Sequence, residues 1–227
     1  MSIGRRAVVE LGHVVRQGMT TLPGVPGPDI VDHLSRADSR ARYAPGTEFQ
    51  IDRISMVANT GTYLDVPYHR FEGGTDLAHF DLARLVDLPG LVVRATAARG
   101  AARGIGPEAF AGLAVAGRAV LVHTGWDAHF GTAEYGADHP FLTEGAVRRL
   151  VEQGAALVGI DSLNIDDSDD LTRPAHTGLL AADIPIVEHL RGLEQLPDAG
   201  FAFHAAPVAV ARMGTFPVRA YALLDAG

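Results

Sequence analysis

Residues 59–69 read Asn59-Thr60-Gly61-Thr62-Tyr63-Leu64-Asp65-Val66-Pro67-Tyr68-His69 and place a carboxylate, an imidazole, a phenol and an amide close together. Pro67 favours extended backbone at the residue before it, so Asp65 and His69 can point into one cavity. Carboxylate oxygen and imidazole nitrogen together suit Zn²⁺, Mn²⁺ or Fe²⁺. Because Asp and His also occur together in loops without a metal, the spacing alone leaves a structural loop as the alternative.

The composition removes several classes of chemistry. Of the 227 residues, 47% are apolar and 20% are charged, which is typical of a globular protein. All 19 basic residues are Arg and there is no Cys, which excludes Schiff-base lysine, P-loop lysine and thiol chemistry. The net charge of −8 disfavours nucleic acid and anionic membrane partners. No apolar run reaches the length of a membrane-spanning helix.

The hydrophobic pattern predicts an α/β domain. Short apolar or β-branched runs predict strands at 7–16, 49–58, 90–96, 118–123, 155–161, 200–210 and 216–224. Helices are expected at 107–114 and 143–154, the second capped by Thr143 and Gly154. Residues 184–190 are expected to form a short helix or turn.

Two loops and the chain start complete the predicted organisation. Residues 18–29 are too rich in Pro and Gly for a helix, and the acidic residues 164–170 predict a solvated loop rather than a calcium site. No repeat or linker interrupts the chain, so one domain is expected over residues 1–227. Glu10 and His13 interrupt the first apolar run too early for a signal peptide, which favours the cytoplasm.

The second half adds two further donor residues. His176 lies in Arg-Pro-Ala-His-Thr-Gly, and Glu188 follows twelve residues later in Ile-Pro-Ile-Val-Glu. With Asn-x-Gly-Thr-Tyr-x-Asp-x-Pro-x-His at 59–69, these features resemble the cyclase family of metal-dependent hydrolases, which includes bacterial kynurenine formamidase and isatin hydrolase. The first motif of that family is His-x-Gly-Thr-His-x-Asp-x-Pro-x-His. Further matching stretches follow in the family's order at 123–126, 139–140, 159–162 and 217–220.

The resemblance implies a fold and a set of roles. The fold is the swivelling β/β/α domain of the kynurenine formamidase type, assembled as a homodimer or homotetramer. Asp65, His176 and Glu188 match metal ligands of the family, and His69 matches its general acid/base. No role is implied for a nucleic acid or a membrane, so the expected partner is a small-molecule substrate.

The departures from the family motif are equally informative. Asn59 and Tyr63 stand where the family has the two His ligands of a first metal. Asn is a weak neutral donor, and Tyr binds such metals only after losing a proton with a pKa near 10. We therefore expect one divalent metal, Mn²⁺ or Zn²⁺, or none. Leu22 stands where formamidase-like members carry Trp, which disfavours an anthranilate-type substrate.

The leading hypothesis is a metal-dependent hydrolase of a small amide, lactam, lactone or ester. The metal would activate a water molecule, and His69 would move its proton. Tyr63 would stabilise the oxyanion or donate a proton, and Asn59 would orient the substrate. Trp126 is a candidate substrate contact, with a place in the core as the alternative.

Two other classes of function fit the same residues. A metal-independent cyclase, dehydratase or isomerase would use Tyr63, His69 and Glu188 as acid/base groups. A non-catalytic protein would bind a small molecule without turnover. The main candidates also have structural alternatives: His69 as a loop residue, Asp65 as a loop cap, and His176 with Glu188 as a hydrogen-bonded pair without metal.

Overall fold

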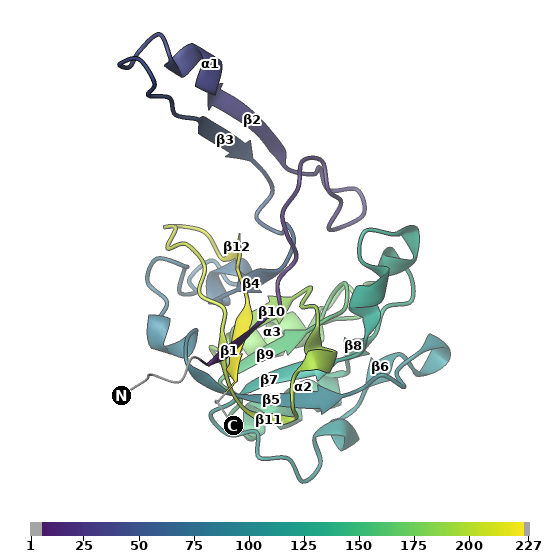
Figure 1. Ribbon diagram of the computed structural model, residues 1–227. Coiled ribbons are helices and arrows are strands. Elements are labelled where there is room, and N and C mark those ends of the chain that lie inside the picture. The colour runs from purple at the N-terminus through teal and green to yellow at the C-terminus, as the bar shows by residue number, and fades with distance from the viewer. Residues whose placement is uncertain (1–5, 225–227) are drawn as a thin grey trace.

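A nine-stranded mixed sheet organises residues 6–224, which the computed structural model describes (Figure 1). In spatial order its strands are β1 (Ala7–Glu10), β13 (Tyr221–Leu224), β11 (Ala199–His204), β5 (Leu88–Arg94), β7 (Ala119–His123), β9 (Leu157–Ile160), β10 (Ile186–Glu188), β4 (Tyr63–Asp65) and β12 (Thr215–Pro217). Strands β5, β7, β9 and β10 are parallel neighbours, and the other pairs are antiparallel. The sheet forms a half-barrel, and the predicted α/β class is confirmed.

The central parallel strands are buried on both faces. In β7, Val120 and Val122 pack into one hydrophobic cluster, while Leu121 packs into the cluster on the opposite face. Continuous apolar runs are typical of parallel strands that are covered on both sides. This arrangement explains why residues 118–123 lack the apolar–polar alternation of a half-exposed strand.

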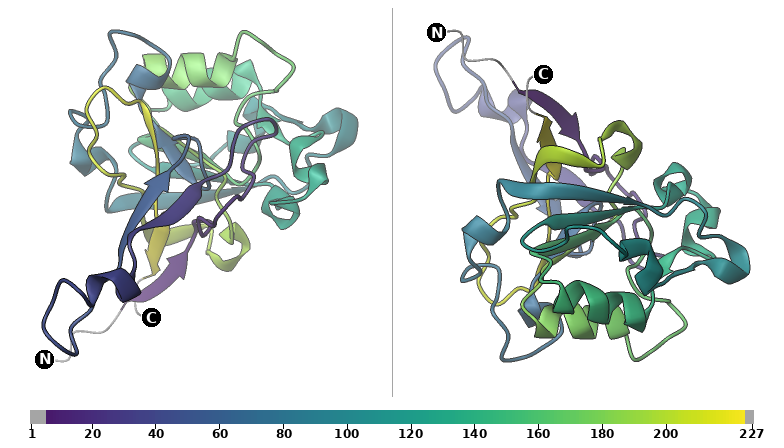
Figure 2. Two further views of the ribbon diagram at one scale, coloured as in Figure 1. Left: turned by 90° about the horizontal axis from the view of Figure 1, so that it is seen from above. Right: turned by 90° about the horizontal axis from the view of Figure 1, so that it is seen from below.

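Two helices lie side by side against one face of the sheet (Figure 2). The first, α2 (Glu144–Glu152), begins after Thr143, whose hydroxyl accepts a hydrogen bond from a first-turn N–H. Gly154 follows its end with a φ of 72°, so both predicted caps are confirmed. The sequence pattern does not predict the second helix, α3 (Pro174–Ala181). Its start is favoured by Pro174, because proline suits the first helical position.

Three predicted elements differ from the structure. The single strand expected at 216–224 is two strands, β12 and β13, which lie at different places in the sheet. Residues 184–190 contain the strand β10 instead of a helix or turn, because this segment hydrogen-bonds to β9 on one side and β4 on the other. Residues 107–114 form only a short 3₁₀ helix, Pro107–Phe110. The backbone turns extended at Ala111 and takes a positive φ at Gly112, which ends the helix.

Smaller elements complete the described chain. An arm projects away from the sheet (Figure 1) and consists of β2 (Asp29–Leu34), α1 (Arg36–Ser39) and β3 (Ile51–Ser55). Strands β6 (Gly104–Ile105) and β8 (Phe141–Leu142) form a short parallel pair. Further 3₁₀ helices span Pro67–His69, Leu82–Arg84, Gly100–Ala102, Trp126–His129, Ala133–Gly136 and Leu193–Gln195. Over residues 6–224, no helix has the length and apolar character needed to cross a membrane.

The register of β4 determines which polar side chains meet. Strand β4 lies between β10 and β12. Across the first pairing Tyr63 is opposite Glu188, and across the second Asp65 is opposite Thr215. All four residues are buried. A single short strand therefore brings together three segments that are far apart in the sequence.

Gly214 allows the chain after β4 to pack tightly against β12. Its carbonyl accepts a hydrogen bond from Val66 N at 2.8 Å. A Cβ atom at position 214 would lie 2.1 Å from the backbone nitrogen of His69 and 2.4 Å from its Cα. These are backbone atoms that cannot rotate away, so only glycine fits between β12 and the segment that carries His69.

His13 is held in a partly buried position near the end of β1. Its ring stacks on Phe130 at a centroid distance of 3.6 Å. Burial, with the nearby positive charges of Arg191 and Arg16, lowers the pKa of His13 from 6.5 to about 4. The folded protein therefore holds this imidazole in its neutral form at neutral pH.

We predict that Gly214→Ala destabilises the fold. The added Cβ must displace the backbone of the His69 segment, and such overpacking typically costs about 1–3 kcal/mol. Urea unfolding measures the loss. Gly73→Ala is the matched control, because a Cβ there meets no atom within 4 Å. Equal stabilities of the two variants would contradict the close approach described above.

Stability is also expected to fall on acidification, in part through His13. The unfolded chain protonates this residue near its ordinary pKa of 6.5, while the folded chain resists protonation until about 4. The contribution of neutral His13 to the free energy of unfolding is therefore complete above about pH 6.5 and is lost as pH falls towards 4. His13→Phe should reduce the slope of unfolding free energy against pH by up to about 1.4 kcal/mol per unit in this window. The exposed His33→Phe is the control, and an unchanged slope in the His13 variant would refute the assignment.

Candidate functional site

A cavity of about 200 Å³ opens where β4, β10, the 3₁₀ helix Pro67–His69 and α3 meet. Its lining brings together five residues singled out from the sequence: Asn59, Tyr63, His69, His176 and Glu188. Leu22, Arg70, Asn164 and Arg173 complete the lining. The carboxylate of Asp65 is fully buried beside this cavity, next to the His176 ring.

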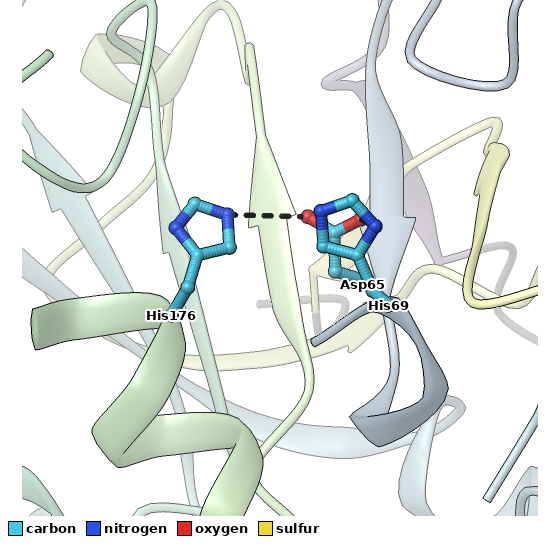
Figure 3. A group of neighbouring side chains, drawn as sticks. All are labelled: Asp65, His69 and His176. Carbon is cyan, nitrogen blue, oxygen red and sulfur yellow. Dashed lines mark ion pairs between the residues drawn. The ribbon is translucent and has the colours of Figure 1, made fainter. Parts of the chain in front are cut away.

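Three of these side chains form a compact group of possible metal ligands. Asp65, His69 and His176 each offer one ligand atom, and these atoms all lie within 4.8 Å of one another. Figure 3 shows His176 reaching from α3 towards Asp65 and His69 on the opposite side. Nε2 of His176 is 3.7 Å from Oδ2 of Asp65 and 3.8 Å from Oε1 of Glu188. One ion with bonds of about 2.0–2.2 Å could span these atoms.

His176 is oriented by Asp166, a residue that the sequence analysis does not single out. Nδ1 of His176 lies 2.6 Å from Oδ2 of Asp166, and the N–H groups of Ala175 and His176 donate to the same carboxylate at 2.5 and 3.1 Å. This contact holds a proton on Nδ1, so the neutral ring presents its lone pair at Nε2. Carboxylate–imidazole pairs of this kind typically support a metal-bound His. The prediction of a solvated loop is wrong for Asp166, which is fully buried.

The donor set leaves one carboxylate oxygen without a partner. Oδ1 of Asp65 accepts a hydrogen bond from Thr215, whereas the buried Oδ2 has no hydrogen-bond partner within residues 6–224 and faces Nε2 of His176 at 3.7 Å. Burial alone would lower the pKa of His176, but Glu188, Asp166 and Asp65 outweigh it and raise that pKa well above its usual value. The surrounding carboxylates thus favour a positive charge at this point. A divalent cation fits this donor set.

Thr215 fixes the protonation pattern of the neutral His69 ring. Its hydroxyl has one proton, which it donates to Oδ1 of Asp65. Oγ1 of Thr215 also lies 2.7 Å from Nδ1 of His69, so this hydroxyl oxygen accepts the Nδ1 proton of that ring. Nε2 of His69 then carries the free lone pair. The sequence analysis does not identify Thr215, because nothing in its local sequence marks it; the β4–β12 register brings it here.

Tyr63 is part of a buried chain of polar side chains. Its hydroxyl donates to Oε2 of Glu188 at 2.6 Å, while Ile165 N donates to Oε1 at 2.6 Å. Nε2 of His189 lies 3.3 Å from the Tyr63 hydroxyl, and Nδ1 of His189 lies 2.8 Å from the Tyr135 hydroxyl. His189 and Tyr135 are absent from the sequence prediction. Together these contacts hold Glu188 in a single orientation.

The chemistry of Tyr63 follows from this burial. Burial, the charge of Glu188 and the charge of Asp65 raise the pKa of Tyr63 well above its ordinary value. Burial also lowers the pKa of His189 to about 3, so that ring is neutral. Tyr63 therefore remains a phenol rather than a phenolate ligand, and its hydroxyl proton points towards Oε2 of Glu188. Its predicted action on a substrate stays a prediction.

The two predicted substrate contacts lie in different places. Asn59 lines the cavity together with Tyr63. Trp126 is outside the cavity lining: it packs with Tyr135 and Leu163, and its Nε1 donates to the Tyr135 carbonyl at 3.0 Å. Leu22 packs against that cluster and also borders the cavity. Trp126 thus supports the cavity wall from behind in this structure.

Comparison with known sequences supplies a family. A family profile described as a putative cyclase matches residues 9–167. The kynurenine formamidase of Erythrobacter litoralis is 26% identical over 206 residues, which cover 91% of this chain and 88% of that protein. The kynurenine formamidase of Bacillus cereus is 26% identical over 177 residues, which cover 75% of this chain and 78% of that protein. The similarity therefore extends over most of the chain.

Comparison with solved structures also finds similarity over nearly the whole chain. Isatin hydrolase A from Ralstonia solanacearum matches with a TM-score of 0.81 and 25% identity, over 96% of this chain and 92% of that one. Isatin hydrolase A from Labrenzia aggregata matches with a TM-score of 0.79 and 25% identity, over 97% and 94%. The half-barrel that carries the cavity is therefore shared with these proteins, as the sequence resemblance predicts.

We predict that Thr215→Val changes which ring nitrogen of neutral His69 carries the proton, and that Thr215→Ser keeps the wild-type tautomer. Valine has nearly the shape of threonine but cannot accept the Nδ1 proton, so the neutral ring should populate both tautomers. NMR shifts of the His69 ring nitrogens at a pH where the ring is neutral report this change. The loss of a buried hydrogen bond should also lower the unfolding free energy by about 1–3 kcal/mol. Identical ring shifts in the wild type and the valine variant would refute the assignment.

Proposed function

The chain belongs to the cyclase family, and from that premise we propose that it uses one divalent metal ion to hydrolyse a small amide, lactam, lactone or ester. Its relatives named kynurenine formamidase and isatin hydrolase identify it as an enzyme of the hydrolase class. A small-molecule substrate is supported by the cavity, whose volume of about 200 Å³ equals that of about six or seven water molecules.

One observation carries the metal part of the proposal. Oδ2 of Asp65, which accepts no hydrogen bond from the described residues, faces Nε2 of His176, and the opposite ring nitrogen of His176 is fixed by Asp166. A buried carboxylate oxygen without a partner is costly unless a cation or a donor satisfies it. Oε1 of Glu188, at 3.8 Å from the same Nε2, is the proposed third ligand atom. Nitrogen and oxygen donors in this mixture suit Mn²⁺ or Zn²⁺.

The metal and His69 have separate tasks in the proposed reaction. A bound cation would polarise the substrate carbonyl and lower the pKa of a water molecule. His69 borders the cavity, and its free Nε2 would accept a proton from the attacking water. A carbon–oxygen bond forms at the carbonyl, the carbon–nitrogen or carbon–oxygen bond of the substrate breaks, and His69 returns the proton to the leaving atom. The products are a carboxylic acid and an amine or alcohol.

Asn59 and Tyr63 support this reaction in different ways. The Asn59 amide lines the cavity, where it would donate a hydrogen bond to the substrate carbonyl. Tyr63 fixes Glu188 through the 2.6 Å hydrogen bond, so that only Oε1 of that carboxylate is directed towards His176. Both residues stand at positions where the family motif has metal-binding His. We therefore propose a single metal ion per cavity.

The arm supports the proposal of a homodimer or homotetramer. An isolated two-stranded ribbon is only marginally stable in water. Every residue of β3 is exposed, including Ile51 and Ile54, so burial of this arm against another subunit would stabilise it. A single domain over residues 1–227 and a cytoplasmic location remain predictions.

The metal is tested by elemental analysis of protein purified without a metal-affinity column. We expect about one Mn or Zn per chain in the wild type. Asp65→Asn should lose it, and Asp166→Asn should weaken metal affinity by about 10- to 100-fold, the usual effect of removing an outer-shell partner. Asp52→Asn, on the exposed arm, is the matched control. Chelation should abolish hydrolysis on a panel of small amides, lactams and esters, and Mn²⁺ or Zn²⁺ should restore it.

Other outcomes would point to specific alternatives. Two metals per chain would show that Asn59 and Tyr63 do not prevent a second site. Turnover that survives chelation but fails in His69→Ala would indicate metal-independent acid/base chemistry through His69, Tyr63 and Glu188. Folded protein that neither binds metal nor turns over any compound would indicate a binding protein.

A further inference from the structure

Two arginine side chains lie at the cavity that holds the proposed metal ligands. Arg70 follows His69 directly, and Arg173 immediately precedes α3, which carries His176. Both line the same cavity as Tyr63. The cavity lining therefore combines carboxylate and imidazole residues with two arginines, of which Arg70 is exposed and Arg173 partly buried.

The backbone at Arg173 is held in an unfavourable conformation. Its φ of 50° and ψ of 61° lie in the left-handed region, which residues with a Cβ rarely adopt. The guanidinium donates to two main-chain carbonyls, those of Asp167 at 3.0 Å and Ser168 at 3.3 Å. A strained backbone combined with a tethered side chain indicates that this Arg is held in a defined place.

Arg70 is held from the other side of the same helix start. Its Nε donates to Thr177 Oγ1 at 3.2 Å, and its guanidinium lies 5.3 Å from the centre of the Phe71 ring. Thr177 is in the first turn of α3, and its N–H donates to the carbonyl of Arg173. The two arginines are thus connected through a single residue. Each keeps N–H donors that these contacts do not use.

No carboxylate of the described chain neutralises either guanidinium by an ion pair. The acidic side chains of the neighbouring loop have closer partners: Asp167 pairs with Arg103 at 2.9 Å, and Asp170 accepts from the Thr172 hydroxyl at 2.6 Å and interacts with Arg173 only through longer-range attraction. In a chain with a net charge of −8, two unpaired positive charges beside one small cavity favour an anion there. Arginine donors match the geometry of a carboxylate in particular.

We propose that Arg70 and Arg173 form an anion-binding pair and that the substrate carries a carboxylate in addition to the bond that is cleaved. This inference rests on the proposed function, because it places the carboxylate of the substrate on the arginines and its amide or ester group near Asp65 and His176. The small cavity restricts the substrate to a compact molecule such as an N-acylated amino acid. The pair therefore sets which small amides enter.

Binding to metal-free protein tests the pair without requiring turnover. Benzoate and benzamide have nearly the same shape and differ in charge, so calorimetry should find benzoate bound at least tenfold more tightly. Arg70→Gln and Arg173→Gln should each weaken benzoate binding by about 10- to 100-fold and leave benzamide binding unchanged, as expected for a hydrogen bond to a charged group. Arg173→Lys keeps the charge but loses the planar fork, and should weaken benzoate less than Arg173→Gln does.

Arg148→Gln is the matched control, because that exposed residue lies on α2 and pairs with Glu144. Equal binding of benzoate and benzamide to the wild type would overturn the proposal, as would unchanged benzoate binding in folded Arg70→Gln and Arg173→Gln variants. Thermal unfolding establishes that the variants are folded.

Turnover by metal-loaded protein separates this inference from the proposed hydrolase. N-formylalanine and its carboxamide analogue form a second matched pair, and the acid should have the higher kcat/KM. Arg173→Gln should reduce that preference at least tenfold, mainly through KM. If neither compound nor any other amide is hydrolysed while benzoate binding still depends on both arginines, the hydrolase fails and the anion site stands. If both compounds are hydrolysed with equal kcat/KM, the proposed hydrolase stands and the anion-binding pair is refuted.

Discussion

The pairing of β4 between β10 and β12 is the constraint on which the rest of the site depends. It sets Tyr63 against Glu188 and Asp65 against Thr215, although more than a hundred residues separate the partners in each pair. A shift of one residue would turn every β4 side chain to the other face of the sheet. This register supplies the buried carboxylate of Asp65 with a hydrogen bond from Thr215, and α3 places His176 opposite its other oxygen.

The cavity combines two electrostatic environments within a small volume. At its floor, carboxylates surround His176 and favour a positive charge, which a proton or a cation supplies. In its wall, Arg70 and Arg173 favour a negative charge. A molecule with a polar carbonyl at one end and an anion at the other would match both. The fold thereby sets the polarity of a ligand as well as its size.

The sequence predicts this fold and site unequally, for physical reasons. The β-branched runs and the motif at 59–69 predict the α/β class, and five sequence-derived candidates line one cavity. Thr215, Asp166 and His189 are missed, because their roles arise from strand register and from loops that close over long distances. The pattern at residues 184–190 predicts a helix or turn, because the three paired residues of β10 are too few to show the alternation of a strand. Trp126 is a candidate substrate contact from the sequence, but in the structure it packs with Tyr135 and Leu163 outside the cavity lining.

The chain Tyr135–His189–Tyr63–Glu188 makes those four residues interdependent. Replacing Tyr63 by His, as in the family motif, would remove the hydroxyl that meets both Glu188 and His189, and would leave two buried polar atoms to find new partners. Effects of substitutions in such a network are not additive, because each residue's environment depends on the others. A change from Tyr63 to the His of the family motif would therefore require coordinated substitutions at several positions, with less stable intermediates between them.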